Sequence, residues 1–126
     1  MKPQVKTLLH IDEHQEDRLR LKHSLLKELP DLELHEANSG LEAIRHIGSL
    51  RVDCVVLDLK LRDIVGTELI RLIQFESRDK PIPIIIWTGL THDMLKQATL
   101  SLGITHHFLK RRDEQEVVLA ILRALA

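Results

Sequence analysis

Five side chains that can bind a cation or a phosphate group each follow a short apolar block of the chain. They are Asp12, Glu13, Asp58, Thr88 and Lys110. Carboxylates that lie together repel one another unless a cation sits among them. Mg²⁺ prefers such oxygen ligands and leaves coordination positions open for phosphate oxygens. A lysine opposite the carboxylates can bind phosphate as a point charge, and an aspartate can form an acyl phosphate. The set therefore indicates Mg²⁺-assisted phosphoryl transfer.

Each of these residues taken singly also has an ordinary structural explanation. An acidic residue after a strand often caps the following helix. Thr88 taken alone fits a turn, and Lys110 taken alone fits a solvated surface position. The functional interpretation rests on the whole set, whose members stand at the ends of four separate apolar blocks.

Two kinds of segment alternate along the chain and must position these residues. Short apolar blocks cover residues 7–11, 32–35, 54–57, 82–87 and 107–109. Between them and after the last, apolar residues recur three and four positions apart over residues 19–29, 41–47, 69–73, 94–102 and 117–125. Such alternation predicts an α/β fold with a parallel sheet covered by helices on both faces. Ligands of such sheets bind beyond the carboxyl ends of the strands, which is where the five side chains are expected.

Local patterns refine this prediction. The consecutive apolar residues of 55–57 and 84–86 indicate central strands that are buried on both faces. The tripeptide 38–40 (Asn-Ser-Gly) offers a cap for the second helix, and Gly103 fits the C-terminal cap of the fourth. Pro81 and Pro83 prevent the third helix from continuing into the fourth strand.

Composition excludes several classes of protein. Lys plus Arg is 18 and Asp plus Glu is 19 in 126 residues, which gives a net charge of −1. The chain therefore lacks the excess of positive charge that direct nucleic-acid binding requires. Aromatic residues make up 2%, which is poor material for stacking bases or flavins. The one cysteine, Cys54, excludes a disulfide framework and indicates a small buried side chain. Without a membrane-length apolar run or a signal peptide, we expect a cytoplasmic single domain over residues 1–126, either a complete protein or an excised domain.

Five motifs in register resemble the response regulator receiver domain of two-component phosphorelay signalling. They cover residues 8–14, 36–44, 58–66, 81–89 and 103–110, and the resemblance extends over about residues 5–125. The segment from Asp58 to Gly66 is similar to the family's phosphoacceptor segment, D-L-x-L-P-D-x-x-G. The resemblance implies a flavodoxin-like (βα)5 fold, a doubly wound parallel five-stranded sheet with strand order 2-1-3-4-5.

The resemblance also implies a role for each site residue. Asp58 would accept a phosphoryl group from a sensor histidine kinase or a histidine phosphotransfer protein. Glu13, Asp58 and the backbone carbonyl of Lys60 would bind Mg²⁺ directly, and Asp12 would act through a water. Lys110 would bind the phosphate. The chain would catalyse only its own phosphorylation and dephosphorylation, a reaction whose rate the side chains of Lys60 and Leu90 would tune.

A switch between two arrangements would carry the signal. Thr88 would move toward the phosphoryl group, and His107 holds the position of the family's usual aromatic switch residue. The face formed by the fourth helix, the fifth strand and the fifth helix would then bind a downstream protein or a fused output domain, and receivers often form homodimers through this region. Candidates for its exposed rim are His92, Lys96, His106, Arg111, Arg112 and Glu116.

The sequence departs from the family pattern at four positions: Glu13 replaces Asp, Arg62 and Arg111 replace Pro, and His107 replaces an aromatic residue and could titrate near neutral pH. These departures leave open a receiver-fold interaction module that works without phosphorylation. Other phosphoryl or phosphate-binding classes fit less well. A haloacid-dehalogenase-type phosphatase requires a second Asp two residues after Asp58, where this chain has Lys60, and a flavodoxin-like FMN carrier requires a phosphate loop in place of the acidic segment 12–17. The eight histidines do not predict a second metal site.

Overall fold

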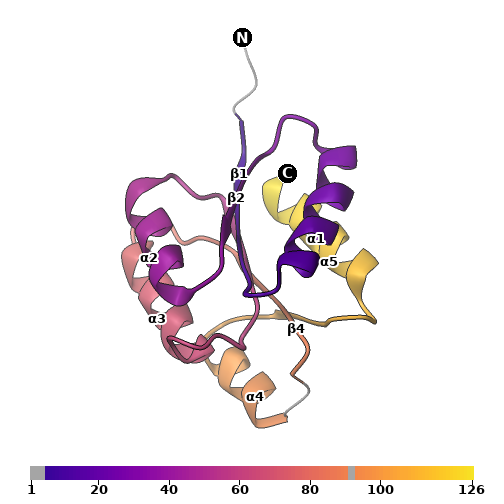
Figure 1. The fold of residues 1–126 in the computed structure, drawn as a ribbon. Coiled ribbons are helices and arrows are strands. Elements are labelled where there is room, and N and C mark those ends of the chain that lie inside the picture. Colours follow the sequence, from indigo (N-terminus) through magenta and orange to yellow (C-terminus); the bar gives the residue numbers. More distant parts are fainter. Residues whose placement is uncertain (1–4, 91–92) are drawn as a thin grey trace.

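The computed structural model describes residues 5–90 and 93–126, in which strands and helices alternate (Figure 1). The strands are β1 (Thr7–Ile11), β2 (Glu33–Ala37), β3 (Cys54–Leu57), β4 (Ile84–Thr88) and β5 (His106–Leu109). The helices are α1 (Gln15–Glu28), α2 (Gly40–Ser49), α3 (Gly66–Glu76), α4 (Asp93–Ser101) and α5 (Glu114–Leu125). The alternation confirms the predicted α/β class. In the described part of the chain, no helix combines the length and the apolar character that crossing a membrane requires.

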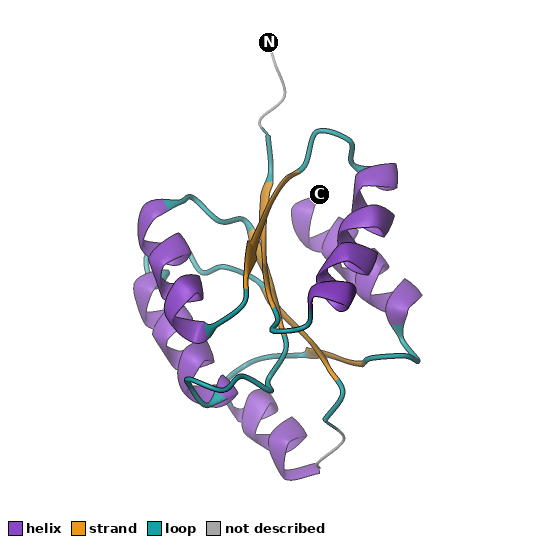
Figure 2. Ribbon diagram, viewed as in Figure 1, coloured by secondary structure: helices purple, strands orange, loops and turns teal. Residues whose placement is uncertain are grey.

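The strands form one parallel sheet in the order β2-β1-β3-β4-β5. Helices α2, α3 and α4 cover one face of the sheet, and α1 and α5 cover the other; Figure 2 shows the strands between these two layers. This arrangement confirms the predicted doubly wound, flavodoxin-like topology. The strand order reverses between β1 and β3, and a crevice at the carboxyl ends of these strands is the usual ligand site of such sheets.

The three inner strands are buried on both faces. Every residue of β1, β3 and β4 is buried, whereas the edge strands β2 and β5 are largely half-buried. Along β4, Ile84 and Ile86 pack against α3, while Ile85 and Trp87 pack against α1 and α5. Two apolar layers on opposite sides therefore hold the inner strands and the residues that follow them.

Five predicted bounds, which belong to the three strands β2, β4 and β5, are wrong by one or two residues. β2 continues to Ala37 because this residue still pairs with Ile11 of β1. β4 begins at Ile84 rather than at 82, because Pro83 has no N–H group to contribute to the ladder. β5 begins at His106, one residue early, since this residue pairs with Ile85.

Helix ends follow the predicted capping residues more closely. The Ser39 hydroxyl accepts a hydrogen bond from the Glu42 N–H at 3.1 Å and caps α2. Gly103 adopts a φ of 84°, and its N–H donates to the Leu100 carbonyl at 2.9 Å after the end of α4. The left-handed backbone at Gly103 turns the chain toward β5 at little cost because glycine has no Cβ.

The described side chains of helix α4 contribute less to the core than those of α5 do. Thr99 is the buried residue among the described side chains of α4, and Leu95 is only partly buried. Helix α5 buries four apolar side chains, namely Val117, Ala120, Ile121 and Leu125.

Candidate functional site

Four of the predicted site residues directly follow, or end, four neighbouring strands. Asp12 follows β1, Asp58 follows β3, Thr88 ends β4 and Lys110 follows β5. Backbone hydrogen bonds hold this edge: Asp58 donates to Ile11 at 2.9 Å, and Lys110 donates to Thr88 at 2.9 Å. Asp12, Asp58 and Thr88 are buried, and Lys110 exposes 9% of its side chain. The fold therefore brings the four side chains together, as the sequence predicts.

The Lys110 ammonium lies among three carboxylates. Its Nζ is 2.7 Å from Asp12 Oδ2, 2.8 Å from Asp17 Oδ2 and 2.9 Å from Asp58 Oδ2. Burial by itself would lower the pKa of Lys110, but hydrogen bonds to Asp12, Asp17 and Asp58 outweigh it and raise that pKa well above its usual range. Lys110 is therefore a fixed positive charge beside Asp58.

Two further donors orient the carboxylate of Asp58. The Thr88 hydroxyl donates to Asp58 Oδ1 at 2.6 Å, and the backbone N–H of Lys60 donates to the same oxygen at 3.2 Å. Lys110 contacts the other oxygen. Asp58 therefore has one oxygen held by a hydroxyl on the adjacent strand and the other held by an ammonium group.

Asp12 is the most enclosed carboxylate of the group. Its Oδ1 accepts the His14 backbone N–H at 2.8 Å, and its Oδ2 lies 3.7 Å from His10 Nε2. Burial would raise the pKa of Asp12, but the contacts with His10, Lys110 and the His14 backbone outweigh it and hold that pKa well below its usual range. Asp12 is therefore ionised at neutral pH and available to a cation.

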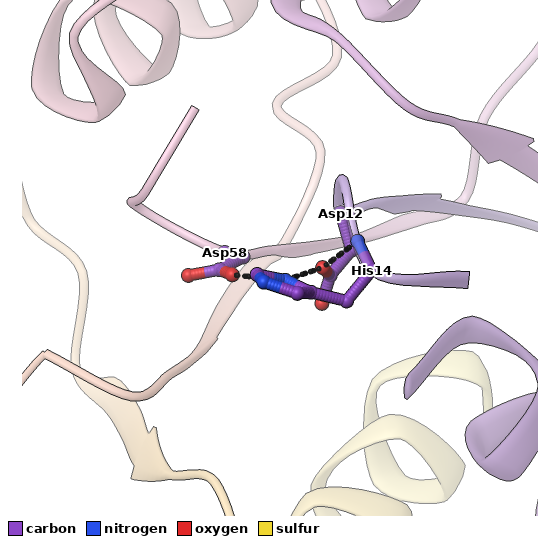
Figure 3. A group of neighbouring side chains, drawn as sticks. All are labelled: Asp12, His14 and Asp58. Carbon is purple, nitrogen blue, oxygen red and sulfur yellow. Dashed lines mark hydrogen bonds and ion pairs between the residues drawn. The ribbon is translucent and has the colours of Figure 1, made fainter. Parts of the chain in front are cut away.

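Glu13 points toward the loop after Asp58. Its Oε2 accepts the Arg62 backbone N–H at 2.8 Å, and its Oε1 lies 3.6 Å from Arg62 Nε. Three other residues, Asp12, His14 and Asp58, present ligand atoms that all lie within 4.8 Å of one another (Figure 3). Direct Mg²⁺ ligation by Glu13 and by the Lys60 carbonyl stays a prediction, and the side chain of Glu13 must turn from Arg62 to fulfil it.

A cleft of about 400 Å³ opens onto Asp58 and gives it access to solvent. Its lining residues are His14, Asp17, Asp58, Lys60, Gly89, Leu90, Leu109, Lys110 and Arg111. The predicted flanking positions, Lys60 and Leu90, both line this cleft. Small phosphorylated compounds can therefore approach Asp58 without displacing a core side chain.

Sequence reasoning did not assign Asp17, His14 or Asp63 to the site. Asp17 lies in the first turn of α1, and His14 directly precedes this helix. The first turn faces the carboxyl ends of the strands, since both side chains contact site residues there. Asp63 accepts the backbone N–H groups of Gly40 and Leu41 at 2.9 Å each and thereby ties the loop after Asp58 to the start of α2. The useful signal is the short connection between β1 and α1, which keeps the first helical turn at the site.

His107 lies on the α4 side of β5, opposite Ile86. It is half-buried, and its Nε2 has no hydrogen-bond partner in the described ranges 5–90 and 93–126. Burial, and then the charge of Lys96, lower the pKa of His107 below its usual value of 6.5. His107 is therefore a neutral side chain at pH 7.

The predicted rim around His107 is largely exposed. Exposed side chains are Lys96, His106, Arg111, Arg112 and Glu116, and His92 lies outside the described residues. Arg111, at the position of the expected proline, adopts a φ of 66°, and its N–H donates to Glu114 Oε1 at 2.7 Å. All peptide bonds of the described residues are trans.

The donor set at the strand ends fits a hard divalent cation. Asp12 and Asp58 offer buried carboxylate oxygens around one point, and the cleft leaves room for water and phosphate oxygens. Asp12, Asp17 and Asp58 bring three negative charges around the single positive charge of Lys110, and a divalent ion would balance the remainder. These residues fit Mg²⁺, the metal implied by the sequence.

Comparisons with known proteins agree with this fold. A family model described as "Response regulator receiver domain" matches residues 8–122. The chain is 34% identical over 83 residues to the CAI-1 autoinducer sensor kinase/phosphatase CqsS of Vibrio cholerae, a match that covers 65% of this chain and 12% of the kinase. The chain thus spans only a small part of this relative.

Two solved structures are similar over nearly the whole chain. The signal receiver domain of an HD domain-containing protein from Pseudomonas fluorescens has a TM-score of 0.85 at 27% identity and covers 97% of this chain and 95% of that one. The response regulator protein TrrA from Thermotoga maritima, solved in complex with Mg²⁺-BeF, has a TM-score of 0.81 at 26% identity and covers 96% and 100%.

Proposed function

The chain belongs to the response regulator receiver domain family, and on that premise we propose that Asp58 accepts a phosphoryl group from a histidine kinase or a histidine phosphotransfer protein. Such a domain is a phosphorylation-dependent signalling switch. The assignment rests on the surroundings of the Asp58 carboxylate. Thr88 and Lys110 hold it at the point where the strand order reverses, and it faces a cleft.

The transfer is a substitution at phosphorus. A carboxylate oxygen of Asp58 attacks the phosphorus of a phosphohistidine, the P–N bond breaks, and the departing imidazole takes up a proton. An acyl phosphate results, and a water that later attacks phosphorus releases inorganic phosphate and restores the Asp58 carboxylate. Asp58, Glu13 and the Lys60 carbonyl would hold Mg²⁺ directly, and Asp12 would hold it through a water. The ion would supply positive charge that neutralises the transferring group.

Lys110 and Thr88 are placed to act on the phosphoryl oxygens. Lys110 carries a fixed positive charge 2.9 Å from Asp58 Oδ2, so it favours negative charge that arrives at this oxygen. The Thr88 hydroxyl donates to Asp58 Oδ1 before transfer and can turn to a phosphoryl oxygen afterwards. Thr88 pairs with Leu109 of β5. A shift of Thr88 would therefore favour a different position of β5, the strand that carries His107.

The output face of this proposal is formed by α4, β5 and α5. A downstream protein or a fused output domain would bind it, and the neutral side chain of His107 would take the part of the family's aromatic switch residue. A homodimer through this face, the cytoplasmic location and the single domain over residues 1–126 stay predictions.

A receiver-fold interaction module that works without phosphorylation is the alternative. The observation that favours it is the placement of Glu13, whose carboxylate contacts Arg62 rather than the carboxylates of Asp12 and Asp58. Such a module would bind its partner equally well with and without Mg²⁺ and a phosphodonor.

Intact-mass measurement with Mg²⁺ and a small acyl phosphate as donor separates the two functions. We expect one phosphoryl adduct that requires Mg²⁺ and is absent in Asp58→Asn. Asp31→Asn, a change in an exposed aspartate that precedes β2 and so lies at the opposite edge of the sheet from the site, should keep the adduct. Failure to form the adduct both with this donor and with a phosphorylated histidine phosphotransfer protein would support the phosphorylation-independent module.

A further inference from the structure

The imidazole of His14 lies between the two buried carboxylates of the site. Its Nδ1 is 3.0 Å from Asp12 Oδ1 and 3.7 Å from Asp58 Oδ2, as the dashed lines in Figure 3 mark. His14 is the N-cap residue of α1, but its side chain makes no capping hydrogen bond. The ring therefore turns away from the helix it precedes and toward the acidic pocket.

These separations suit three ligands of one metal ion. With metal–ligand bonds of about 2.1 Å, two ligand atoms on one octahedral ion lie roughly 3.0 Å apart when adjacent and about 4.2 Å apart when opposite. The two separations from His14 Nδ1 fall in this interval. All three ligand atoms lie within 4.8 Å of one another, a bound slightly wider than the interval. Small side-chain rotations are then enough to surround an ion with two oxygens and one nitrogen.

Two further groups lie behind Asp12, on the side of its Oδ2. Lys110 Nζ contacts this oxygen at 2.7 Å, which leaves Asp12 Oδ1 on the side of His14. A partner that holds one oxygen of a ligating carboxylate orients the other in metal sites generally. His10 is fully buried, its Nε2 lies 3.7 Å from the same Oδ2, and neither of its ring nitrogens has a hydrogen-bond partner among the described residues.

Nitrogen in the ligand set changes which ions the site prefers. Mg²⁺ binds oxygen ligands and water, whereas imidazole suits borderline ions such as Co²⁺, Ni²⁺ and Zn²⁺. We propose that His14 is a nitrogen ligand of the Asp12–Asp58 site, so that the pocket binds a borderline transition-metal ion. Its preference for Mg²⁺ over such ions is then weaker than that of a pocket with carboxylate ligands alone. The proposal shares its pocket with the proposed function, but it concerns metal binding in the absence of any phosphodonor.

Calorimetric titration of the full chain with CoCl₂ and with MgCl₂ tests the proposal. The variants are His14→Asn and, as a matched control, His35→Asn. His35 and His46 form another histidine pair, with ring centroids 5.7 Å apart, and could bind Co²⁺ adventitiously. We expect His14→Asn to raise the Co²⁺ Kd by about tenfold or more and the Mg²⁺ Kd by less than about twofold. His35→Asn should leave both constants unchanged.

Electron spin echo modulation of Cu²⁺ bound to the unmodified chain gives a second readout that does not depend on a variant's folding. Imidazole suits Cu²⁺. The nitrogen of a bound imidazole couples to the Cu²⁺ spin, and this coupling should disappear in His14→Asn. An unchanged Co²⁺ Kd in His14→Asn, a loss of Co²⁺ binding in His35→Asn instead, or a Cu²⁺ site without nitrogen coupling would each overturn the proposal.

The outcome is independent of phosphorylation. If His14→Asn still forms the Asp58 adduct in Mg²⁺ and binds Co²⁺ as the unmodified chain does, only the His14 proposal fails. If nitrogen ligation by His14 is found and no metal supports an adduct, only the proposed function fails.

Discussion

Lys110 Nζ lies 2.8 Å from Asp17 Oδ2, so the ammonium at the end of β5 is tied to the first turn of α1 as well as to Asp58. The carboxylate of Asp17 adds a negative charge to the site that a phosphoryl group must approach. It also offers Lys110 a partner that competes with the phosphoryl oxygens.

Asp17→Asn should therefore accelerate phosphorylation by a small phosphodonor. We expect an increase on the order of fivefold, which corresponds to about 1 kcal/mol of removed repulsion in a partly solvated site. Initial rates from intact-mass time courses measure it, and Asp31→Asn serves as a charge-matched control. A slower rate in Asp17→Asn would show instead that Asp17 is needed to position Lys110.

Thr88→Val removes the hydroxyl that donates to Asp58 Oδ1 while keeping nearly the same volume. Because this hydrogen bond is buried and its acceptor is charged, we expect the free energy of unfolding to fall by about 2 kcal/mol. Urea unfolding measures the change, and Thr88→Ser should recover most of it. A loss of stability in Thr88→Ser together with none in Thr88→Val would mean that the methyl group of Thr88, not its hydroxyl, stabilises the site.

His107 should make stability depend on pH. Its pKa is below 6.5 in the folded chain because burial, and then Lys96, disfavour the charged ring. Between the lowered pKa and 6.5 the unfolded chain binds more protons, so the contribution of His107 to stability is complete above pH 6.5 and is lost as pH falls through that window. Urea unfolding from about pH 7.5 to about pH 5.5 should show a steeper loss for the unmodified chain than for His107→Phe. The same comparison with His106→Asn, a change in an exposed neighbour, should show no such difference.

Gly66 and Gly48 should respond oppositely to alanine. A Cβ on Gly66 would lie 2.8 Å from the Leu59 carbonyl oxygen and 2.9 Å from Leu59 Cα, whereas a Cβ on Gly48 meets nothing within 4 Å. We expect Gly66→Ala to cost about 1–3 kcal/mol and Gly48→Ala, inside α2, to gain about 0.5–1 kcal/mol. Because Leu59 lies between Asp58 and Lys60, Gly66→Ala should also weaken Mg²⁺ binding. An unchanged Mg²⁺ Kd would show that the loop yields without moving the site.

The sequence predicts the core of the site because the geometry of a parallel sheet is so restrictive. Once the apolar blocks are assigned to strands, the carboxyl ends of those strands meet at one edge, and Asp12, Asp58, Thr88 and Lys110 follow. The proline effect on β4 was also available from the sequence, since Pro83 cannot donate to a neighbouring strand.

The sequence does not predict where the loop side chains point. Asp12 and Glu13 are adjacent acidic residues, and only the backbone path after β1 turns one toward Lys110 and the other toward Arg62. The roles of Asp17 and His14 depend on α1 beginning at Gln15, and the apolar spacing that predicts this helix starts only at Leu19. Helix start sites leave little trace in hydrophobic periodicity when the first turn is polar.

The small apolar area that the described side chains of α4 bury affects how much free energy a signal needs to move this helix. Thr99 is its buried anchor among the described side chains, whereas four apolar side chains fix α5. Local unfolding free energies scale with the apolar area that an element buries, so amide hydrogens of α4 should exchange faster than those of α5. A helix whose described side chains bury so little apolar area needs only a small bias to change its average position. A single hydroxyl or imidazole contact at its border can therefore shift the ensemble, and the signal does not have to disrupt the main core.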